Sequence, residues 1–250
     1  MPAFLISLYS TIVYVAFLAT FLYAIGFVEA VGVPKTIDSG TAGSPALSLL
    51  VDAALLGLFA LQHTIMARPR FKRLLTRIIP AEAERSTFVL LASAALALVC
   101  WQWRPVPQLA WSVEGPLAAA LITAVSWCGW GMLLISTFLI SHFELFGLEQ
   151  GFARLLRRAP ANPSFATPFL YRWLRHPIYA GFILAFWAAP HMSLGHLAFA
   201  VLTTAYIFIG IWFEERDLTA RFGERYRQYR RTVGMLLPRF RSGAPRTAPR

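Results

Sequence analysis

The residues best suited to chemistry lie in two polar segments in the C-terminal third of the chain. The first reads Arg175-His176-Pro177-Ile178-Tyr179-Ala180-Gly181. Pro177 suits the first turn of a helix, where its missing N–H group costs nothing, so we expect His176 to cap that helix. The N–H groups behind Pro177 would then be free to hold an anion, such as the carboxylate of a cofactor. Gly181 would let a ligand or a neighbouring backbone approach closely. The alternative is a plain helix cap, anchored at a membrane interface by Arg175 and Tyr179.

The second segment combines paired carboxylates with two tyrosines. Glu214-Glu215-Arg216-Asp217-Leu218 follows directly after an apolar run, and Phe222-Gly223-Glu224-Arg225-Tyr226-Arg227-Gln228-Tyr229-Arg230 comes next. The paired carboxylates can accept hydrogen bonds from ribose hydroxyls or pair with arginines. Tyr226 and Tyr229 are three residues apart and therefore share one face of a helix. The alternative is an ion-paired helix at a membrane interface.

The composition places both segments in a membrane protein. Of the 250 residues, 57% are hydrophobic and 14% are charged, whereas a soluble domain carries about 25% charged residues. This excludes an ordinary soluble enzyme, a disordered protein and a disulfide scaffold, since Cys100 and Cys128 both lie inside apolar runs. We predict an all-α polytopic bundle of five to six transmembrane helices, because a span needs about 20 mainly apolar residues. The apolar runs are 4–28, 46–66, 86–103, 117–140, 178–190 (a short run, joined to the last by a tight hairpin) and 195–213.

The basic residues predict the orientation of the bundle. Of the 23 lysines and arginines, 21 lie in the stretches 68–85, 154–175 and 216–250. Because basic residues concentrate on the cytosolic side, we expect six crossings with both termini in the cytosol of a bacterium. The net charge of +11 then reflects topology and contact with lipid headgroups rather than with nucleic acid. We expect a single domain, with a four-span half (1–153), a cofactor-binding core (168–240) and a disordered tail (241–250).

This topology gathers three of the five histidines, His63, His142 and His176, at the inner interface with the carboxylates. His191 and His196 fall on the opposite side, where we interpret them as hairpin residues. The sequence has no His-x-x-x-His or Cys-x-x-Cys spacing, so we predict no metal site.

In this order and spacing the motifs resemble a known superfamily. Arg-His-Pro-x-Tyr-x-Gly (175–181), Glu-Glu-x-x-Leu (214–218) and Gly-x-x-Tyr-x-x-Tyr (223–229) resemble the C-terminal core of the isoprenylcysteine carboxyl methyltransferases. Members of that superfamily are integral-membrane enzymes that use S-adenosylmethionine. The resemblance implies that His176, Pro177, Tyr179 and Gly181 line this cofactor, while Glu215, Leu218 and Tyr226 close over it. Glu214 would orient the ribose or an arginine. By position alone, we expect Tyr171 and Arg172 to cover the adenine.

Over nearly the whole chain, from about residue 33 to residue 239, the sequence is similar to the methanethiol S-methyltransferases. The similar segments include Val33-Pro34-Lys35-Thr36-Ile37-Asp38-Ser39-Gly40, Leu61-Gln62-His63, Glu84-Arg85-Ser86-Thr87 and Phe186-Trp187-Ala188-Ala189-Pro190. NnrU-type membrane proteins share part of the N-terminal half. In the carboxyl methyltransferases an arginine about one turn before the paired glutamates faces the substrate carboxylate. Gly210 stands there in this chain, and a small neutral thiol needs no such partner.

The resemblance therefore implies transfer of a methyl group from S-adenosylmethionine to methanethiol, which gives dimethyl sulfide. The thiol must lose its proton, because the thiolate is the nucleophile. His142 or Tyr179 could take that proton while Arg175 stabilises the anion, and we favour His142 because histidine is the usual base near neutral pH. The alternatives are a related membrane methyltransferase acting on another thiol, a prenylcysteine or a lipid amine, and a non-enzymatic NnrU-like protein. The sequence leaves the oligomeric state open.

Overall fold

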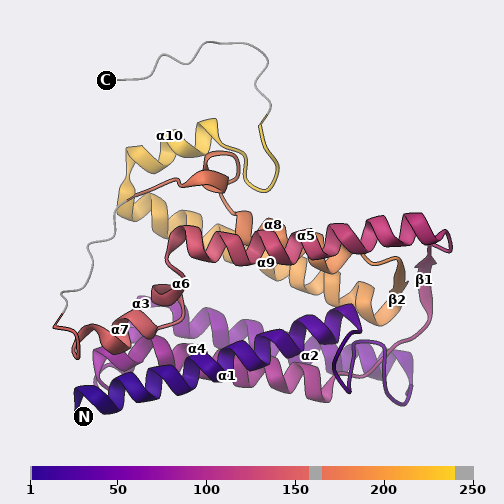
Figure 1. Ribbon diagram of the computed structural model, residues 1–250, viewed down its shortest axis with the longest axis horizontal. Coiled ribbons are helices and arrows are strands. Elements are labelled where there is room, and N and C mark those ends of the chain that lie inside the picture. The colour runs from indigo at the N-terminus through magenta and orange to yellow at the C-terminus, as the bar shows by residue number, and fades with distance from the viewer. Residues whose placement is uncertain (1, 158–164, 240–250) are drawn as a thin grey trace.

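The computed structural model describes residues 2–157 and 165–239, and its long helices lie side by side along the longest axis of the molecule (Figure 1). Within that part of the chain, five helices are long and apolar enough to cross a bilayer. They are α1 (Ala3–Glu29), α2 (Pro45–Ala67), α4 (Ala81–Gln102), α5 (Pro116–Ile140) and α9 (Leu194–Phe222). The prediction of a multi-pass helical bundle is confirmed. The predicted tail (241–250) and residues 158–164 of the predicted linker lie outside the described residues.

Shorter elements connect or flank these helices. They are α3 (Pro69–Leu75), α6 (His142–Leu145), α7 (Leu148–Ala153), the 3-10 helix η1 (Phe169–Arg172), α8 (Pro177–Trp187), α10 (Glu224–Thr232) and the strands β1 (Leu109–Ser112) and β2 (His191–Ser193).

The last long helix differs from its prediction in a way that affects the site. The sixth apolar run ends at residue 213, but α9 continues to Phe222. Glu214 and Glu215 therefore lie inside the helix rather than after it. The helix ends at Gly223, which has a φ of 57°, a conformation that favours glycine. This turn directs α10 back over the side of the molecule that carries the two glutamates.

The fifth predicted span is a short helix followed by extended chain. With 11 residues, α8 is only about 16 Å long, against about 30 Å of hydrocarbon. Residues 188–190 and β2 complete the crossing, and β2 pairs antiparallel with β1. The exposed carbonyls find partners there, because Val113 N donates to Pro190 O at 2.9 Å and Trp111 Nε1 donates to Ala189 O at 3.0 Å. Non-helical backbone is tolerated at membrane depth only when its polar groups are satisfied in this way.

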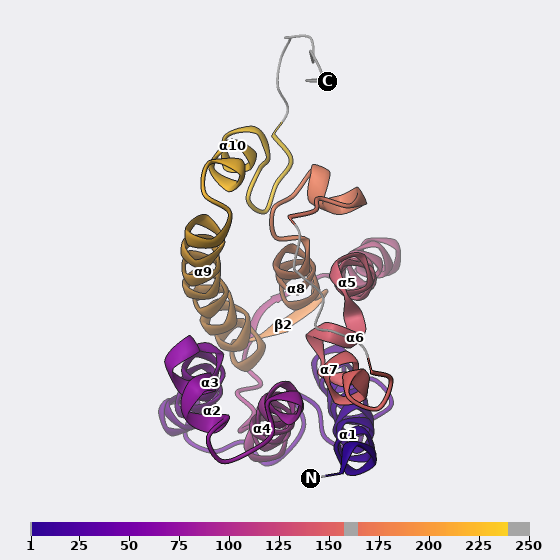
Figure 2. The same ribbon diagram turned by 90° about the vertical axis from the view of Figure 1, so that its left-hand side faces the viewer.

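The described parts of the basic stretches lie together at one end of the bundle. α3, α7, α10 and the N-terminus lie at this end, which we call the basic end, and the β1–β2 pair lies at the other (Figure 1). The described chain therefore runs along the long axis six times, five times as a long helix and once through α8 and its extended continuation. Seen along the helices, α9 lies between the α2–α3 corner and α8, and α8 lies next to α5 (Figure 2).

Two glycines let α5 and α8 pack with their backbones almost in contact. A Cβ atom at Gly129 would lie 2.6 Å from the carbonyl oxygen of Gly181, and a Cβ atom at Gly181 would lie 2.7 Å from that of Gly129. Small residues at such crossings are the main means of close helix packing inside a membrane. The sequence predicted that either a ligand or a neighbouring backbone approaches Gly181. In the structure, the backbone of α5 approaches it.

The α5–α8 crossing can be tested with two alanine substitutions in the same helix. Gly129→Ala places a methyl group against backbone atoms of α8, and we expect it to lower the free energy of unfolding by about 1–3 kcal/mol. Gly131→Ala meets nothing within 4 Å and should leave stability unchanged or raised by up to about 1 kcal/mol. Thermal unfolding in detergent measures both. Equal melting temperatures for the two variants would contradict the crossing.

Candidate functional site

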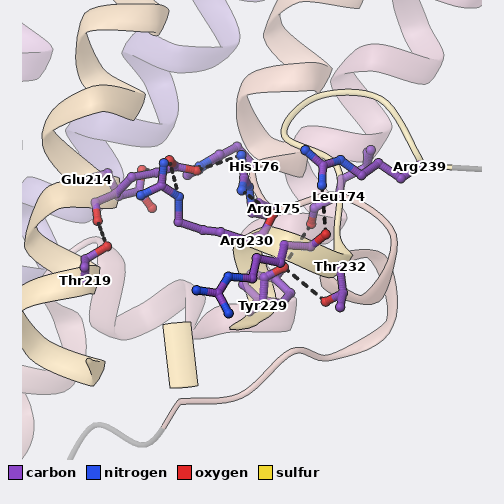
Figure 3. Close-up of polar contacts among 11 residues, drawn as sticks. Leu174, Arg175, His176, Glu214, Thr219, Tyr229, Arg230, Thr232 and Arg239 are labelled. Carbon is purple, nitrogen blue, oxygen red and sulfur yellow. Dashed lines mark hydrogen bonds and ion pairs between the residues drawn. The ribbon is translucent and has the colours of Figure 1, made fainter. Parts of the chain in front are cut away.

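The site is built around the carboxylate of Glu215, which three positively charged or protonatable groups surround. Glu215 Oε1 lies 3.0 Å from Arg175 Nη2 and 3.2 Å from His176 Nε2, and Oε2 lies 3.0 Å from Arg230 Nε. Glu215 is only 7% exposed. Figure 3 shows Arg175, His176 and Arg230 close together with Glu214. A buried carboxylate needs such partners to offset its lost hydration, so this cluster fixes α9, α10 and the start of α8 together.

Hydrogen bonds to the backbone hold the Arg175–His176 segment from the other side. Arg175 N donates to Gly234 O at 2.8 Å, and His176 N donates to Met235 O at 3.1 Å. The Tyr229 hydroxyl donates to the carbonyl of Tyr171. Burial raises the pKa of Tyr229 to about 12, so this hydroxyl stays protonated and keeps donating. The segment after α10 therefore clamps the chain immediately before α8.

The start of α8 has the form predicted from the sequence. Pro177 is the first helical residue and His176 is the cap residue, and the His176 side chain makes no hydrogen bond to the helix N–H groups. It faces the glutamates instead. The first N–H groups of α8 are thus left for another partner, which suits an anionic group of a ligand.

Glu214 is held much less tightly than Glu215. Its Oε2 atom lies 3.7 Å from His176 Nδ1, and its side chain is 43% exposed. The Tyr179 hydroxyl lies beside it. Burial and the nearby Glu214 charge also raise the pKa of Tyr171 above its ordinary value. Glu214 thus lies close to Tyr171, Tyr179 and His176. Its carboxylate can still accept further hydrogen bonds.

Two buried polar atoms at this site have no hydrogen-bond partner among the described residues. They are the Tyr226 hydroxyl, in a residue that is 1% exposed, and Arg175 Nε. Leaving such groups unpaired costs about 1–3 kcal/mol each, so a bound molecule with acceptor atoms would relieve that cost. A cofactor with a carboxylate and ribose hydroxyls fits this donor set, with the spare acceptor capacity of Glu214 beside it.

The remaining predicted site residues occupy varied positions. Leu218 is half-buried on α9, one turn beyond the glutamates, and Arg172 is exposed at the end of η1. A groove of about 450 Å³ between α9 and α10 borders Glu215 and Arg230 from outside. Arg230 was not predicted from the sequence. The available signal was the turn at Gly223, which brings α10 back toward the glutamates.

His142, the predicted base, lies in a separate polar group. Its Nε2 atom is 2.8 Å from the Tyr14 hydroxyl, and its Nδ1 atom is 2.8 Å from Thr137 Oγ1. Because the Thr137 hydroxyl donates to Leu134 O, it accepts from Nδ1–H, and Nε2 then accepts from Tyr14. The ring also stacks on Phe138 at 4.1 Å. None of these contacts reaches the Glu215 cluster, and the role of His142 as base stays a prediction.

Comparison with known proteins adds relatives that cover nearly the whole chain. No protein-family model and no solved structure matches it. The chain is 52% identical over 239 residues to methanethiol S-methyltransferase 1 of Bradyrhizobium diazoefficiens, covering 96% of this chain and 84% of that protein. It is 49% identical over 238 residues to the methanethiol S-methyltransferase of Mycobacterium tuberculosis, covering 95% and 98%. The chain belongs to the methanethiol S-methyltransferase family. A weaker likeness, 31% over 63% of this chain and 58% of the other, links the family to Nurim of Xenopus laevis.

In this member of the methanethiol S-methyltransferase family, two matched substitutions test the Glu215 cluster. Glu215→Gln removes a buried charge that faces two arginines and His176, and we expect it to cost about 3 kcal/mol of stability. Limited trypsin digestion should then cut at the arginines of α10. Glu224→Gln breaks exposed pairs with Arg227 and Arg231 and should change stability by less than about 1 kcal/mol. Equal protection of α10 in the two variants would show that Glu215 does not hold it.

Proposed function

We propose that the protein transfers a methyl group from S-adenosylmethionine to methanethiol and forms dimethyl sulfide. The observation that carries this proposal is the near-complete coverage by relatives named methanethiol S-methyltransferase. The donor set around Arg175, His176, Glu214 and Tyr226 supports the choice of cofactor. When bound, S-adenosylmethionine supplies a methyl group on a positively charged sulfur.

The residues of the chain divide into a fixed frame and a set of groups left for the cofactor. Glu215, Arg175, His176 and Arg230 form the frame, because their side chains contact one another. The free N–H groups at the start of α8 hold the carboxylate of the cofactor, and Glu214 accepts hydrogen bonds from its ribose. The Tyr226 hydroxyl and Arg175 Nε donate to its remaining acceptors. Tyr171 and Tyr179 cover the bound molecule from the sides.

Catalysis by this arrangement consists mainly of positioning. A methyl transfer from sulfur to sulfur needs no covalent intermediate, so holding the two reactants in line supplies most of the rate. Arg175 is paired with Glu215. Its charge is therefore not available to stabilise the thiolate, and Arg175 instead positions the start of α8. Glu214 fixes the cofactor. A site shielded by α10 keeps water away from the reacting methyl group.

The basic end of the bundle faces the cytosol in this proposal. The basic stretches of the chain lie at that end, and such residues are retained on the cytosolic side of a bacterial inner membrane. The cofactor is charged and enters from the aqueous side. Methanethiol is small and apolar and reaches the site through the bilayer.

The first experiment measures dimethyl sulfide by headspace gas chromatography. Membranes that contain the protein, supplied with S-adenosylmethionine and methanethiol, should form dimethyl sulfide. Glu214→Ala should reduce the product at least about 100-fold, because the cofactor loses its fixed orientation. His191→Gln, a substitution of an exposed histidine at the opposite end, serves as the control and should retain full activity. If wild-type membranes form no product, the proposed function is wrong.

The cofactor site can be tested without turnover. Isothermal titration calorimetry of the purified protein should show saturable binding of S-adenosylmethionine. We expect His176→Ala and Glu214→Ala each to abolish measurable binding, since Glu214 contacts the ligand and His176 holds the start of α8 against Glu215. His176→Ala should melt at a lower temperature than Glu214→Ala, because only the former removes a partner of Glu215, and melting in detergent should show that both variants are folded. Unchanged affinity in both variants would refute this cofactor site.

A further inference from the structure

His63 combines a free ring nitrogen with an apolar setting near the basic end. It lies four residues before the end of α2. Its ring stacks on Phe59 at 5.5 Å and contacts Phe88 at 4.8 Å, measured between ring centroids. Its Nδ1 atom is buried and has no hydrogen-bond partner within residues 2–157 and 165–239. Neither the cofactor site nor the helix packing described above uses this nitrogen.

The other histidines are already engaged or lie elsewhere. His142 has a partner on each ring nitrogen, and His176 faces both glutamates. His191 pairs with Ser112 near the β1–β2 end, and His196 lies in the first turn of α9 at that same end. In the part of the chain that the structure describes, His63 is thus the histidine near the basic end with a ring nitrogen free to take a proton.

Neighbours of His63 on α2 contact the face of α9 that borders the cofactor site, since Phe59 packs edge-on against Tyr206. Thr64 also hydrogen-bonds to the Tyr206 hydroxyl at 3.2 Å, and α9 packs on both α2 and α8 (Figure 2). The Tyr179 hydroxyl lies 3.7 Å from the position that a Cβ atom of Gly210 would occupy. Residues 206, 210 and 214 share one helix face. Tyr206 lies about 12 Å deeper than Glu214 along α9, and Thr64, the residue next to His63, reaches its hydroxyl.

The aromatic contacts of His63 suit a small thiol. The aromatic rings of Phe59 and Phe88 offer apolar surface to a methyl group and a sulfur atom. Within residues 2–157 and 165–239, no carboxylate is hydrogen-bonded to His63 Nδ1, where it could compete for the proton.

We infer that His63 is the proton acceptor for the thiol, and this inference rests on the proposed function. The S–H bond of methanethiol breaks and its proton goes to Nδ1 of neutral His63. The sulfur electron pair forms the new bond to the methyl carbon, and the electron pair of the broken carbon–sulfur bond stays on the sulfur of the donor. The imidazolium then releases the proton to water. The thiol thus approaches from the hydrocarbon side while the cofactor is held at the polar end.

The test compares the pH dependence of His63→Gln with that of the wild type, using methanethiol and saturating S-adenosylmethionine. Loss of a general base costs about 10²- to 10⁴-fold, so we expect a loss of at least about 100-fold near pH 7. The deficit should shrink by nearly tenfold per pH unit at higher pH, because the thiol then ionises by itself and thiolate is the nucleophile. His191→Gln is the matched control. The cofactor affinity and the melting temperature of His63→Gln should match the wild type.

Every other result overturns either the inference about His63 or the proposed function. A deficit that does not change with pH would make His63 a packing residue and overturn the inference. If His142→Gln shows the pH-dependent deficit and His63→Gln does not, the base is His142 and the inference is again wrong. Lost cofactor binding in His63→Gln would also overturn it. A wild-type protein that forms no dimethyl sulfide would instead refute the proposed function itself.

Discussion

The buried Glu215 carboxylate is the interaction on which the arrangement of the site depends. It faces Arg175 and His176 from the chain before α8 and Arg230 from α10. A buried ion cluster is strongly destabilised when one partner is lost, because the others remain uncompensated. These contacts keep α10 over the start of α8. They also pair the Glu215 carboxylate with the two arginines, so none of these three charges is left for a ligand. Glu214, next to it on α9, is left as the acceptor that a ligand can use.

The sequence predicted the two motifs of this site but not all the residues that contact them. The motifs at 175–181 and 214–229 do meet, since the helices that carry them end at the same face of the bundle. Arg230 and the contacts at Gly234–Met235 were not predicted: Gly223 signals a turn, but the sequence does not give the direction in which the turn sends α10. The extension of α9 through Glu214 and Glu215 was also missed. Hydropathy marks where a helix leaves the hydrocarbon, not where it ends.

The histidines show a second limit of sequence analysis. Hydropathy and the basic residues placed His63 and His142 at the same depth, but they do not specify which side of a helix faces the interior. A soluble helix reveals that side by its apolar stripe, whereas a transmembrane helix such as α2 is apolar nearly all round. The occupied nitrogens of His142 and the free Nδ1 of His63 therefore emerge only from the packing of α1, α2 and α4.

The short α8 explains how polar and apolar chemistry can share one site. A full transmembrane helix would be apolar along its whole length, but α8 ends at Trp187 and its extended continuation finds hydrogen-bond partners at β1. Its other end, with the free N–H groups, lies level with Glu214 and the arginines. Deeper along the same face of α9, Gly210 and Tyr206 adjoin aromatic rings instead of charges. Under the proposed function, the polar end suits the charged cofactor and the apolar region below it suits the thiol, so the two reactants would approach the methyl group from opposite sides. An arginine in place of Gly210 would put a charge at this boundary, which suits a carboxylate-bearing substrate rather than a neutral thiol.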